Sequence, residues 1–156
     1  MLINHYYDSK NFSLYKNGNT LRVRQKNSNL LLEYKRKQSE NKEPRVCKEF
    51  SKVITHLPDF ISNTQMPELE LECKSISFKY LGSLITERAS FEIDNIKIAF
   101  DKNYYFGNLD YEIEIEISKH LNAEKLEQLL SVKELKRNFR SKYTRFLEKY
   151  ISMKSL

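Results

Sequence analysis

The alternation of acidic and apolar residues in the stretch 110–117, Asp-Tyr-Glu-Ile-Glu-Ile-Glu-Ile, constrains the fold of this chain more than any other feature. Side chains of a β-strand point alternately to opposite faces, so this period of two predicts a strand. Glu112, Glu114 and Glu116 would then share one face and repel one another. A solvated face tolerates that repulsion at modest cost, whereas a divalent cation or opposing Arg and Lys side chains would make it useful.

Basic residues alternate with apolar residues in two segments nearer the N-terminus. Asn17-Gly18 predicts a hairpin turn, because these residues adopt positive φ at low cost. The segments 21–26 and 30–35 follow with the same period of two as the acidic stretch. Their charged residues and those just beyond them are Arg22, Arg24, Lys26, Glu33, Lys35 and Lys37.

The rest of the chain reads as further strands and a few helices. We expect a short strand over 45–53 that carries Glu49, and helix within 57–82, entered near Pro58 and again after Pro67. Strands resume at 88–93 and 97–101, and Gly107-Asn108 forms the turn before the acidic strand. Asn122 predicts the N-cap of one helix, and a last helix begins at about Ser141 with an apolar stripe of Tyr143, Phe146, Leu147 and Tyr150.

Two arrangements satisfy these patterns. In an open sheet, the charged faces meet solvent and the apolar faces meet the core. In a closed sheet, the charged faces line a wet interior and the apolar faces turn outward onto packed helices. Ionisable groups dominate the polar faces here, and their signs are segregated by strand. We therefore predict an α+β fold, a mainly antiparallel β-barrel with helices packed outside, in a single domain that spans residues 1–156.

Composition narrows the class of partner. The net charge of +6 points to an anionic partner, although 27 basic and 21 acidic residues exclude a simple polybasic tail. No apolar run approaches the length of a membrane span, and no signal-peptide pattern follows Met1, so we expect a cytoplasmic protein without a membrane partner. Cys47 and Cys73 lack zinc-site spacing and fit a reducing compartment.

The order of several short motifs resembles the CYTH domain, also called the triphosphate tunnel metalloenzyme family, and most closely its small stand-alone bacterial members. The family includes inorganic triphosphatases, thiamine triphosphatases and class IV-type adenylate cyclases. The resemblance implies an eight-stranded antiparallel tunnel that binds a triphosphate with Mg²⁺ or Mn²⁺. The motifs are Tyr7-Asp8, Leu21-Arg-Val-Arg24, Tyr34-Lys35, Tyr80-Leu-Gly-Ser-Leu-Ile-Thr-Glu-Arg88, Phe100-Asp101, Tyr111-Glu-Ile-Glu114 and Ser141-Lys-Tyr143.

One motif of the family is missing from its expected place. The resemblance implies an N-terminal strand with the pattern Glu-x-Glu-x-Lys before the Tyr-Asp motif, and here the sequence begins almost at that motif. Either the start is truncated or the chain is a degenerate member of the family. In both cases we expect a tunnel without its first strand, and an open edge there would favour a homodimer by strand addition. Glu70-Leu-Glu72-Cys-Lys74 has the pattern but stands elsewhere, so we interpret it, with Glu68, as a solvated helical or loop segment.

Basic residues of the shared motifs are the expected phosphate ligands. A triphosphate carries several negative charges, which Arg binds through forked donors and Lys through a compact point charge. A lysine at the start of the last helix adds the helix N-terminus to its own charge. The expected phosphate ligands are Arg22, Arg24, Lys35, Arg88 and Lys142.

Acidic residues of the same motifs are the expected metal ligands. Glu112 and Glu114 offer the hard oxygen atoms that Mg²⁺ prefers, and Glu116, on the same face, is the third candidate. Glu112, Glu114 and Lys142 are the expected catalytic residues. Two more carboxylates, Glu49 and Asp101, match acidic positions of the family and would orient the basic residues or form ordinary ion pairs.

These residues leave the activity open. Hydrolysis of inorganic triphosphate or of an organic triphosphate, such as thiamine triphosphate or a nucleotide, is the first expectation. A class IV-like adenylate cyclase would use the same residues to align a ribose hydroxyl against the α-phosphate. A non-catalytic polyphosphate or single-stranded RNA binding module is the alternative of another class. Nucleic acid is the less expected partner, because the acidic strand would repel its backbone, and a scaffold without turnover ranks third.

Overall fold

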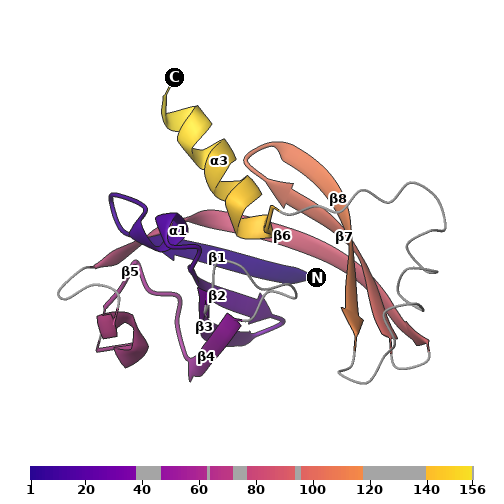
Figure 1. Ribbon diagram of the computed structural model, residues 1–156, viewed down its shortest axis with the longest axis horizontal. Coiled ribbons are helices and arrows are strands. Elements are labelled where there is room, and N and C mark those ends of the chain that lie inside the picture. Colours follow the sequence, from indigo (N-terminus) through magenta and orange to yellow (C-terminus); the bar gives the residue numbers. More distant parts are fainter. Residues whose placement is uncertain (38–46, 63, 72–76, 94–95, 118–139, 156) are drawn as a thin grey trace.

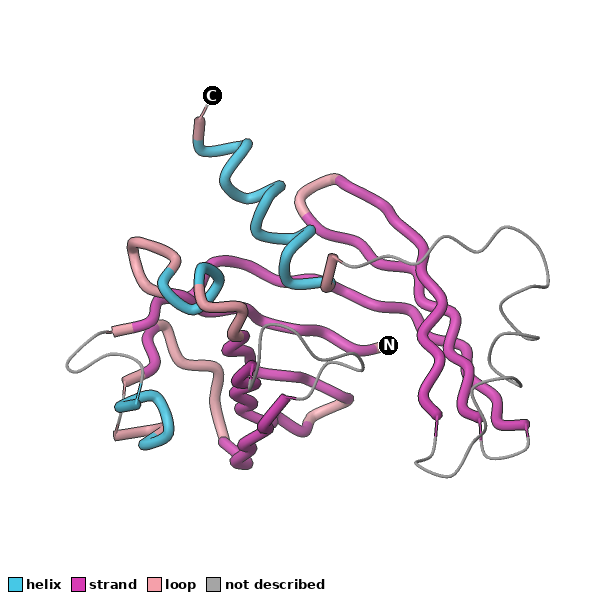
Figure 2. Tube along the Cα trace, in the orientation of Figure 1, coloured by secondary structure: helices cyan, strands magenta, loops and turns pink. Residues whose placement is uncertain are grey.

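A computed structural model describes residues 1–37, 47–62, 64–71, 77–93, 96–117 and 140–155. Most of these residues form strands, and the other described elements are one short α-helix, one long α-helix and a 3-10 helix (Figures 1 and 2). In chain order the elements are β1 Leu2–Asp8, α1 Ser13–Lys16, β2 Thr20–Lys26, β3 Asn29–Lys37, β4 Cys47–Ile54, β5 Phe60–Ile61, η1 Pro67–Leu71, β6 Phe78–Ile93, β7 Ile96–Tyr105, β8 Asn108–Ile117 and α3 Lys142–Lys154.

The strands form one eight-stranded antiparallel sheet in the order β4-β3-β2-β1-β6-β7-β8, and the short β5 pairs with β6. The long β6 therefore joins an N-terminal half, β1 to β4, to a C-terminal half, β7 and β8 (Figure 1). The prediction of a mainly antiparallel α+β fold is confirmed. Among the described strands, no hydrogen-bonded pairing joins β4 to β8, so the sheet curves without closing into a hydrogen-bonded barrel.

The register places the charged residues of both halves on the same side of the sheet. Tyr6 of β1 pairs with Arg22 of β2. Farther along, Arg88 of β6 pairs with Asp101 of β7, which in turn pairs with Glu112 of β8. We call the side that carries these residues the inner face. The predicted segregation of charged and apolar residues by strand face is therefore found.

Apolar side chains form a core on each face. On the outer face, Tyr7, Leu21, Val23 and Leu32 of the strands are buried against residues of α1, β5 and η1. A second cluster lies on the inner face, where the side chains of α3 pack on the sheet. Its buried members are Tyr6, Leu81, Leu84, Tyr105, Tyr143, Phe146 and Leu147.

The position of α3 differs from the predicted covering of the outer face by helices. The stripe of apolar residues was correctly predicted, but it packs on the inner face, and this brings the first turn of the helix to the charged strands. The helix begins just after Ser141, as expected, and Ser141 caps it by accepting a hydrogen bond from the backbone N–H of Thr144. The Tyr143 hydroxyl donates to the buried carboxylate of Asp8 over 2.6 Å, so the helix is fastened to β1.

Three local predictions were wrong or fall outside the described residues. Asn17-Gly18 ends α1 instead of forming a two-residue hairpin, because Gly18 takes the positive φ that closes a helix. Among the described residues, the strand β5 follows Pro58 where helix was predicted, and a 3-10 helix, η1, begins at Pro67. The helix predicted at Asn122, and Glu72 and Lys74 of the displaced motif, lie outside the described residues.

Candidate functional site

Three carboxylates from neighbouring strands converge on the inner face. They belong to Asp101 of β7 and to Glu112 and Glu114 of β8, and one oxygen atom of each lies within 4.8 Å of the others. The alternating acidic stretch brings the two glutamates together, since they stand two residues apart on one strand. Asp101 joins them because it is the cross-strand partner of Glu112. Asp101 was predicted only as a supporting residue.

The ammonium group of Lys142 lies at the centre of this carboxylate cluster. Its Nζ is 2.8 Å from Asp101 Oδ2, and it also donates to Glu112 Oε1 and Glu114 Oε1. Burial opposes the charge of Lys142, but the hydrogen bonds to the three carboxylates outweigh it and raise the pKa of this group. Burial likewise opposes ionisation of Glu114, yet the contact with Lys142 and the charge of Arg88 lower its pKa to about 2.

Two arginines complete the compensation of the acidic residues. Arg88 forms a bidentate pair with Asp101, at 2.7 and 2.6 Å, and its Nη2 also lies 2.5 Å from Glu114 Oε2. Arg145, one turn after Lys142 on α3, pairs with Glu112 and, at 3.0 Å, with Asp110. We call Asp101, Asp110, Glu112 and Glu114 the acidic wall.

Opposite charges dominate the inner face of the N-terminal half. Arg22 is 8% exposed, and its Nε donates to Glu33 Oε2 over 2.7 Å. Arg24 lies farther from the same carboxylate, with Nη1 3.4 Å from Glu33 Oε1. Lys35 pairs with Glu49 at 2.6 Å, and both side chains are partly exposed. We call Arg22, Arg24, Glu33, Lys35 and Glu49 the basic wall.

The basic wall holds polar atoms without partners. Within the part of the chain that the structure describes, the buried Nη2 of Arg22, Nε of Arg24 and Oδ1 of Asn4 have no hydrogen-bond partner. Asn4 is 4% exposed and is the cross-strand neighbour of Arg24. Burial and the nearby charge of Arg22 lower the pKa of Arg24, which shows that its positive charge is poorly compensated. Buried donors without acceptors are costly, so a ligand or water is expected here.

The two walls lie close enough to influence one another. The charge of Arg88 contributes to the lowered pKa of Arg24. Burial raises the pKa of Tyr6, and the charges of Arg22 and Lys142, one from each side, partly oppose that rise. The structure therefore brings Arg22, Arg24, Arg88 and Lys142 to one region of the inner face.

The remaining predicted residues lie nearer the margin. Glu116 is outside the carboxylate cluster, and its exposed side chain lies 3.3 Å from Lys97 Nζ. Glu49 lies on β4, where the hydrogen bond from Lys35 lowers the pKa of its carboxyl group in spite of the opposing effect of burial. Both contacts are of the exposed kind that contributes little to stability.

Several residues of the site were not predicted from the sequence. Glu33 could have been found from its cross-strand pairing with Arg22, and Arg145 from its place one turn after Lys142, on the same side of a helix. Asp110 is held by Asn103, Tyr105 and Arg145, which come from two elements. Asn4 carries no sequence signal of its own, because only the structure shows that its amide oxygen is buried and has no partner among the residues described.

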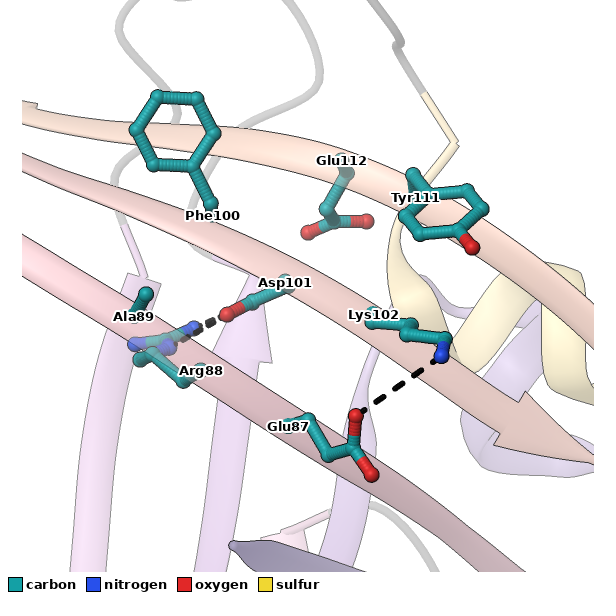
Figure 3. Close-up of a pocket in the computed structure, with 8 residues that line it drawn as sticks. All are labelled: Glu87, Arg88, Ala89, Phe100, Asp101, Lys102, Tyr111 and Glu112. Atoms are coloured by element: carbon teal, nitrogen blue, oxygen red, sulfur yellow. Dashed lines mark hydrogen bonds and ion pairs between the residues drawn. The ribbon is translucent and has the colours of Figure 1, made fainter.

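A pocket of about 410 Å³ adjoins the acidic wall between β6, β7 and β8 (Figure 3). The close-up shows the pair of Arg88 with Asp101 beside a second pair, Glu87 with Lys102. The register assigns the first pair to the inner face and the second to the outer face. Ala89, Phe100 and Tyr111 share the outer face with Glu87 and Lys102, so most of the pocket lining belongs to that face, and Glu112 completes the lining from the inner face.

The donor set of the acidic wall fits a divalent cation. Carboxylate oxygens are the ligands that Mg²⁺ and Mn²⁺ prefer, and three of them converge within the span of one coordination sphere. The ammonium group of Lys142 lies at their centre on a side chain that is only 11% exposed, which shows that this position stabilises a positive charge.

Comparison with known proteins identifies the class. The model of the CYTH domain matches residues 1–147, so the chain belongs to the CYTH family. It is 30% identical over 157 aligned positions to a Bacillus subtilis (strain 168) protein named "Putative triphosphatase YjbK", covering 93% of this chain and 78% of that protein.

Solved structures share the fold. A "putative adenylate cyclase" from Bacillus halodurans is 23% identical, with a TM-score of 0.70 over 93% of this chain and 81% of that one. HpAC1 from Hippeastrum, described as a "putative adenylyl cyclase" with a dominant triphosphatase activity, is 19% identical, with a TM-score of 0.64 over 95% and 81%. In the described part of the present chain, no helix is long and apolar enough to cross a membrane.

Proposed function

We propose that this chain binds a triphosphate on its inner face and hydrolyses it with Mg²⁺ or Mn²⁺. The observation that carries the proposal is a pair of buried donors that have no partner among the described residues, Arg22 Nη2 and Arg24 Nε, on the same face of the sheet as a cluster of three carboxylates. The donors suit phosphate oxygens, and the carboxylates suit the metal that accompanies a triphosphate. Membership of the CYTH family and the similarity to YjbK support the same activity.

The basic wall would bind phosphate, and the acidic wall would bind the metal ion. Arg22, Arg24 and Lys35 bind phosphate oxygens, and Arg88 extends the donor set toward the acidic wall. Asp101, Glu112 and Glu114 would hold the metal ion, which when bound offsets the negative charge that develops on the phosphates. A carboxylate of Glu112 or Glu114 accepts a hydrogen bond from water and orients it. Lys142 neutralises these carboxylates and can also meet phosphate.

The test measures phosphate release from tripolyphosphate with Mg²⁺ or Mn²⁺, beside parallel assays of ATP conversion to cyclic AMP and of single-stranded RNA binding. We expect tripolyphosphate hydrolysis, no cyclic AMP, and weak RNA binding that falls steeply with salt. Tight RNA binding without tripolyphosphate binding would instead favour the nucleic-acid module.

A double variant separates binding from turnover. Glu112→Gln with Glu114→Gln keeps shape but removes two carboxylates, so it should abolish hydrolysis and spare most tripolyphosphate binding. Glu92→Gln with Glu148→Gln, at two exposed positions, is the matched control and should keep both. Full activity of the first double variant would show that the metal lies elsewhere.

We also propose a cellular location, a domain organisation and an oligomeric state for the protein. We expect a cytoplasmic enzyme that consists of one tunnel domain over residues 1–156. The strands at the ends of the described sheet, β4 and β8, offer edges for a homodimer. Analytical ultracentrifugation at several concentrations would detect such a dimer, and a single monomeric species would exclude it.

A further inference from the structure

We infer that the ammonium of Lys142 holds the place of the metal ion, and that Lys142 moves to the phosphate side when a divalent cation binds. Metal and triphosphate then bind in concert because one side chain serves both. This inference rests on the function proposed above, since it assumes that Asp101, Glu112 and Glu114 hold the metal.

Lys142 already occupies the position that the metal ion would take. Nζ of Lys142 contacts the same three carboxylates that could hold the metal, one oxygen of each. Its side chain is only 11% exposed, so these contacts are largely shielded from solvent. An ammonium and a divalent cation cannot both lie within bonding distance of the same oxygens, because like charges so close repel strongly.

The charge balance of the acidic wall requires one resident cation to leave when the metal ion binds. The acidic wall has four carboxylates, and three cations of the described residues, Arg88, Lys142 and Arg145, lie on it. A divalent cation added to this group would leave it with excess positive charge unless a resident cation withdraws. Arg88 is fixed by its bidentate pair with Asp101 and its contact with Glu114. Lys142, on a flexible four-carbon stem, is the cation that can leave.

The side chain of Lys142 has a second position that it can reach, on the phosphate-binding side. It is the first residue of α3, while Tyr143 and Phe146 anchor the same helix in the inner core and to Asp8, so the side chain can swing without moving the helix. Tyr6, which lies within electrostatic reach of Lys142, is the cross-strand partner of Arg22. On that side an unpaired ammonium would join a crowded set of cations, and only a bound polyanion would compensate it.

A coupling of the two ligands follows. Metal alone leaves the ammonium of Lys142 without its carboxylates, so it should bind weakly. Tripolyphosphate alone cannot use the ammonium of Lys142, because this group is already paired with the carboxylates. With both present, each removes the penalty of the other, and such couplings typically change affinity by about 5- to 150-fold.

The first experiment measures Mn²⁺ affinity by isothermal titration calorimetry without any phosphate, so that metal–phosphate complexes in solution cannot interfere. Lys142→Met should bind Mn²⁺ about tenfold or more tightly than the unmodified protein. Lys142→Arg, which keeps the charge, should bind it weakly. Lys149→Met makes the same charge change on the same helix and should leave the affinity unchanged. Equal affinities in Lys142→Met and the unmodified protein would overturn the inference.

The second experiment needs no variant and covers the case in which Lys142→Met fails to fold. An amine-acetylating reagent followed by mass spectrometry reports how accessible each lysine is. Mn²⁺ should increase acetylation of Lys142 and leave Lys149 unchanged, and tripolyphosphate added to the metal-bound protein should protect Lys142 again. Acetylation of Lys142 that does not respond to bound Mn²⁺ refutes the movement. If the unmodified protein binds neither Mn²⁺ nor tripolyphosphate, the proposed function itself fails.

Discussion

The basic wall and the acidic wall differ in how completely their charges are compensated. In the basic wall, Arg22 and Arg24 share the single carboxylate of Glu33, and a buried nitrogen of each has no partner among the described residues. In the acidic wall, Glu112 and Glu114 each contact two cations. The basic wall is therefore ready for an anion, whereas the acidic wall must first lose a partner before it can accept a cation.

The largest expected effect comes from the buried pair of the basic wall. Arg22→Met leaves the carboxylate of Glu33 buried with only the 3.4 Å contact to Arg24, so we expect a loss of about 3 kcal/mol of unfolding free energy in urea denaturation. It should also lose tripolyphosphate binding. The double variant Arg22→Met with Glu33→Leu should regain most of the stability but none of the binding. A stable single variant would show that the pair is not structural.

The second prediction separates binding from stability within the same wall. Within the described ranges, Arg24 has one long contact to Glu33 and a buried Nε without a partner, so its removal costs the fold little. Arg24→Ala should keep its unfolding free energy within about 1 kcal/mol. Its tripolyphosphate affinity in calorimetry should fall roughly ten- to a hundredfold, as expected for lost hydrogen bonds to a charged group. Lys10→Ala, at an exposed turn, is the charge-matched control and should bind normally.

The third prediction tests the compensation of the acidic wall in the metal-free protein. The folded-state pKa of Glu114 is about 2, below its ordinary value of 4.5, so its ionised form stabilises the fold. That contribution is complete above about pH 4.5 and is lost as the pH falls toward 2. Melting temperatures measured across this interval should therefore fall, and Glu114→Gln should fall less steeply. Parallel curves for both proteins would contradict the assignment.

The contrast between the walls was only partly visible in the sequence. Alternation placed Arg22 with Arg24, and Glu112 with Glu114, on strand faces, and the pattern at Ser141 placed the start of the last helix. These are local properties that period and capping encode directly. The antiparallel sheet and the segregation of charge therefore followed from the residues.

The partners of these residues could not be predicted in the same way. The contacts of Lys142 with Asp101, Glu112 and Glu114 were not predicted, because they arise where α3 packs its apolar stripe on the inner face. No local pattern states which face a helix covers, and the expected binding of phosphate by Lys142 stays a prediction. The pairing of Arg22 with Glu33 depends on strand register. Likewise, the short β5 after Pro58 forms because it pairs with β6, far along the chain.

The smallest expected effect lies at the exposed margin of the basic wall, where Lys35 and Glu49 form a pair with 33% and 57% of their side chains exposed. Such pairs contribute less than about 1 kcal/mol, so neither Lys35→Met nor Glu49→Gln should change the melting temperature appreciably. Their effects on tripolyphosphate affinity should nevertheless have opposite signs. Lys35→Met removes a cation from the wall and should weaken binding about threefold, a small effect because exposed charges are screened.

Glu49→Gln should strengthen tripolyphosphate binding about twofold, because it replaces the charged acceptor of Lys35 by a neutral amide oxygen and so frees the positive charge of Lys35 from its carboxylate partner. Calorimetry at low and at high salt checks both variants, and the two differences should shrink together as salt rises. If Glu49→Gln weakens binding instead, Glu49 holds Lys35 in the orientation that phosphate needs. The margin of the basic wall would then be as fully compensated as the acidic wall, and the contrast between the walls would be confined to Arg22 and Arg24.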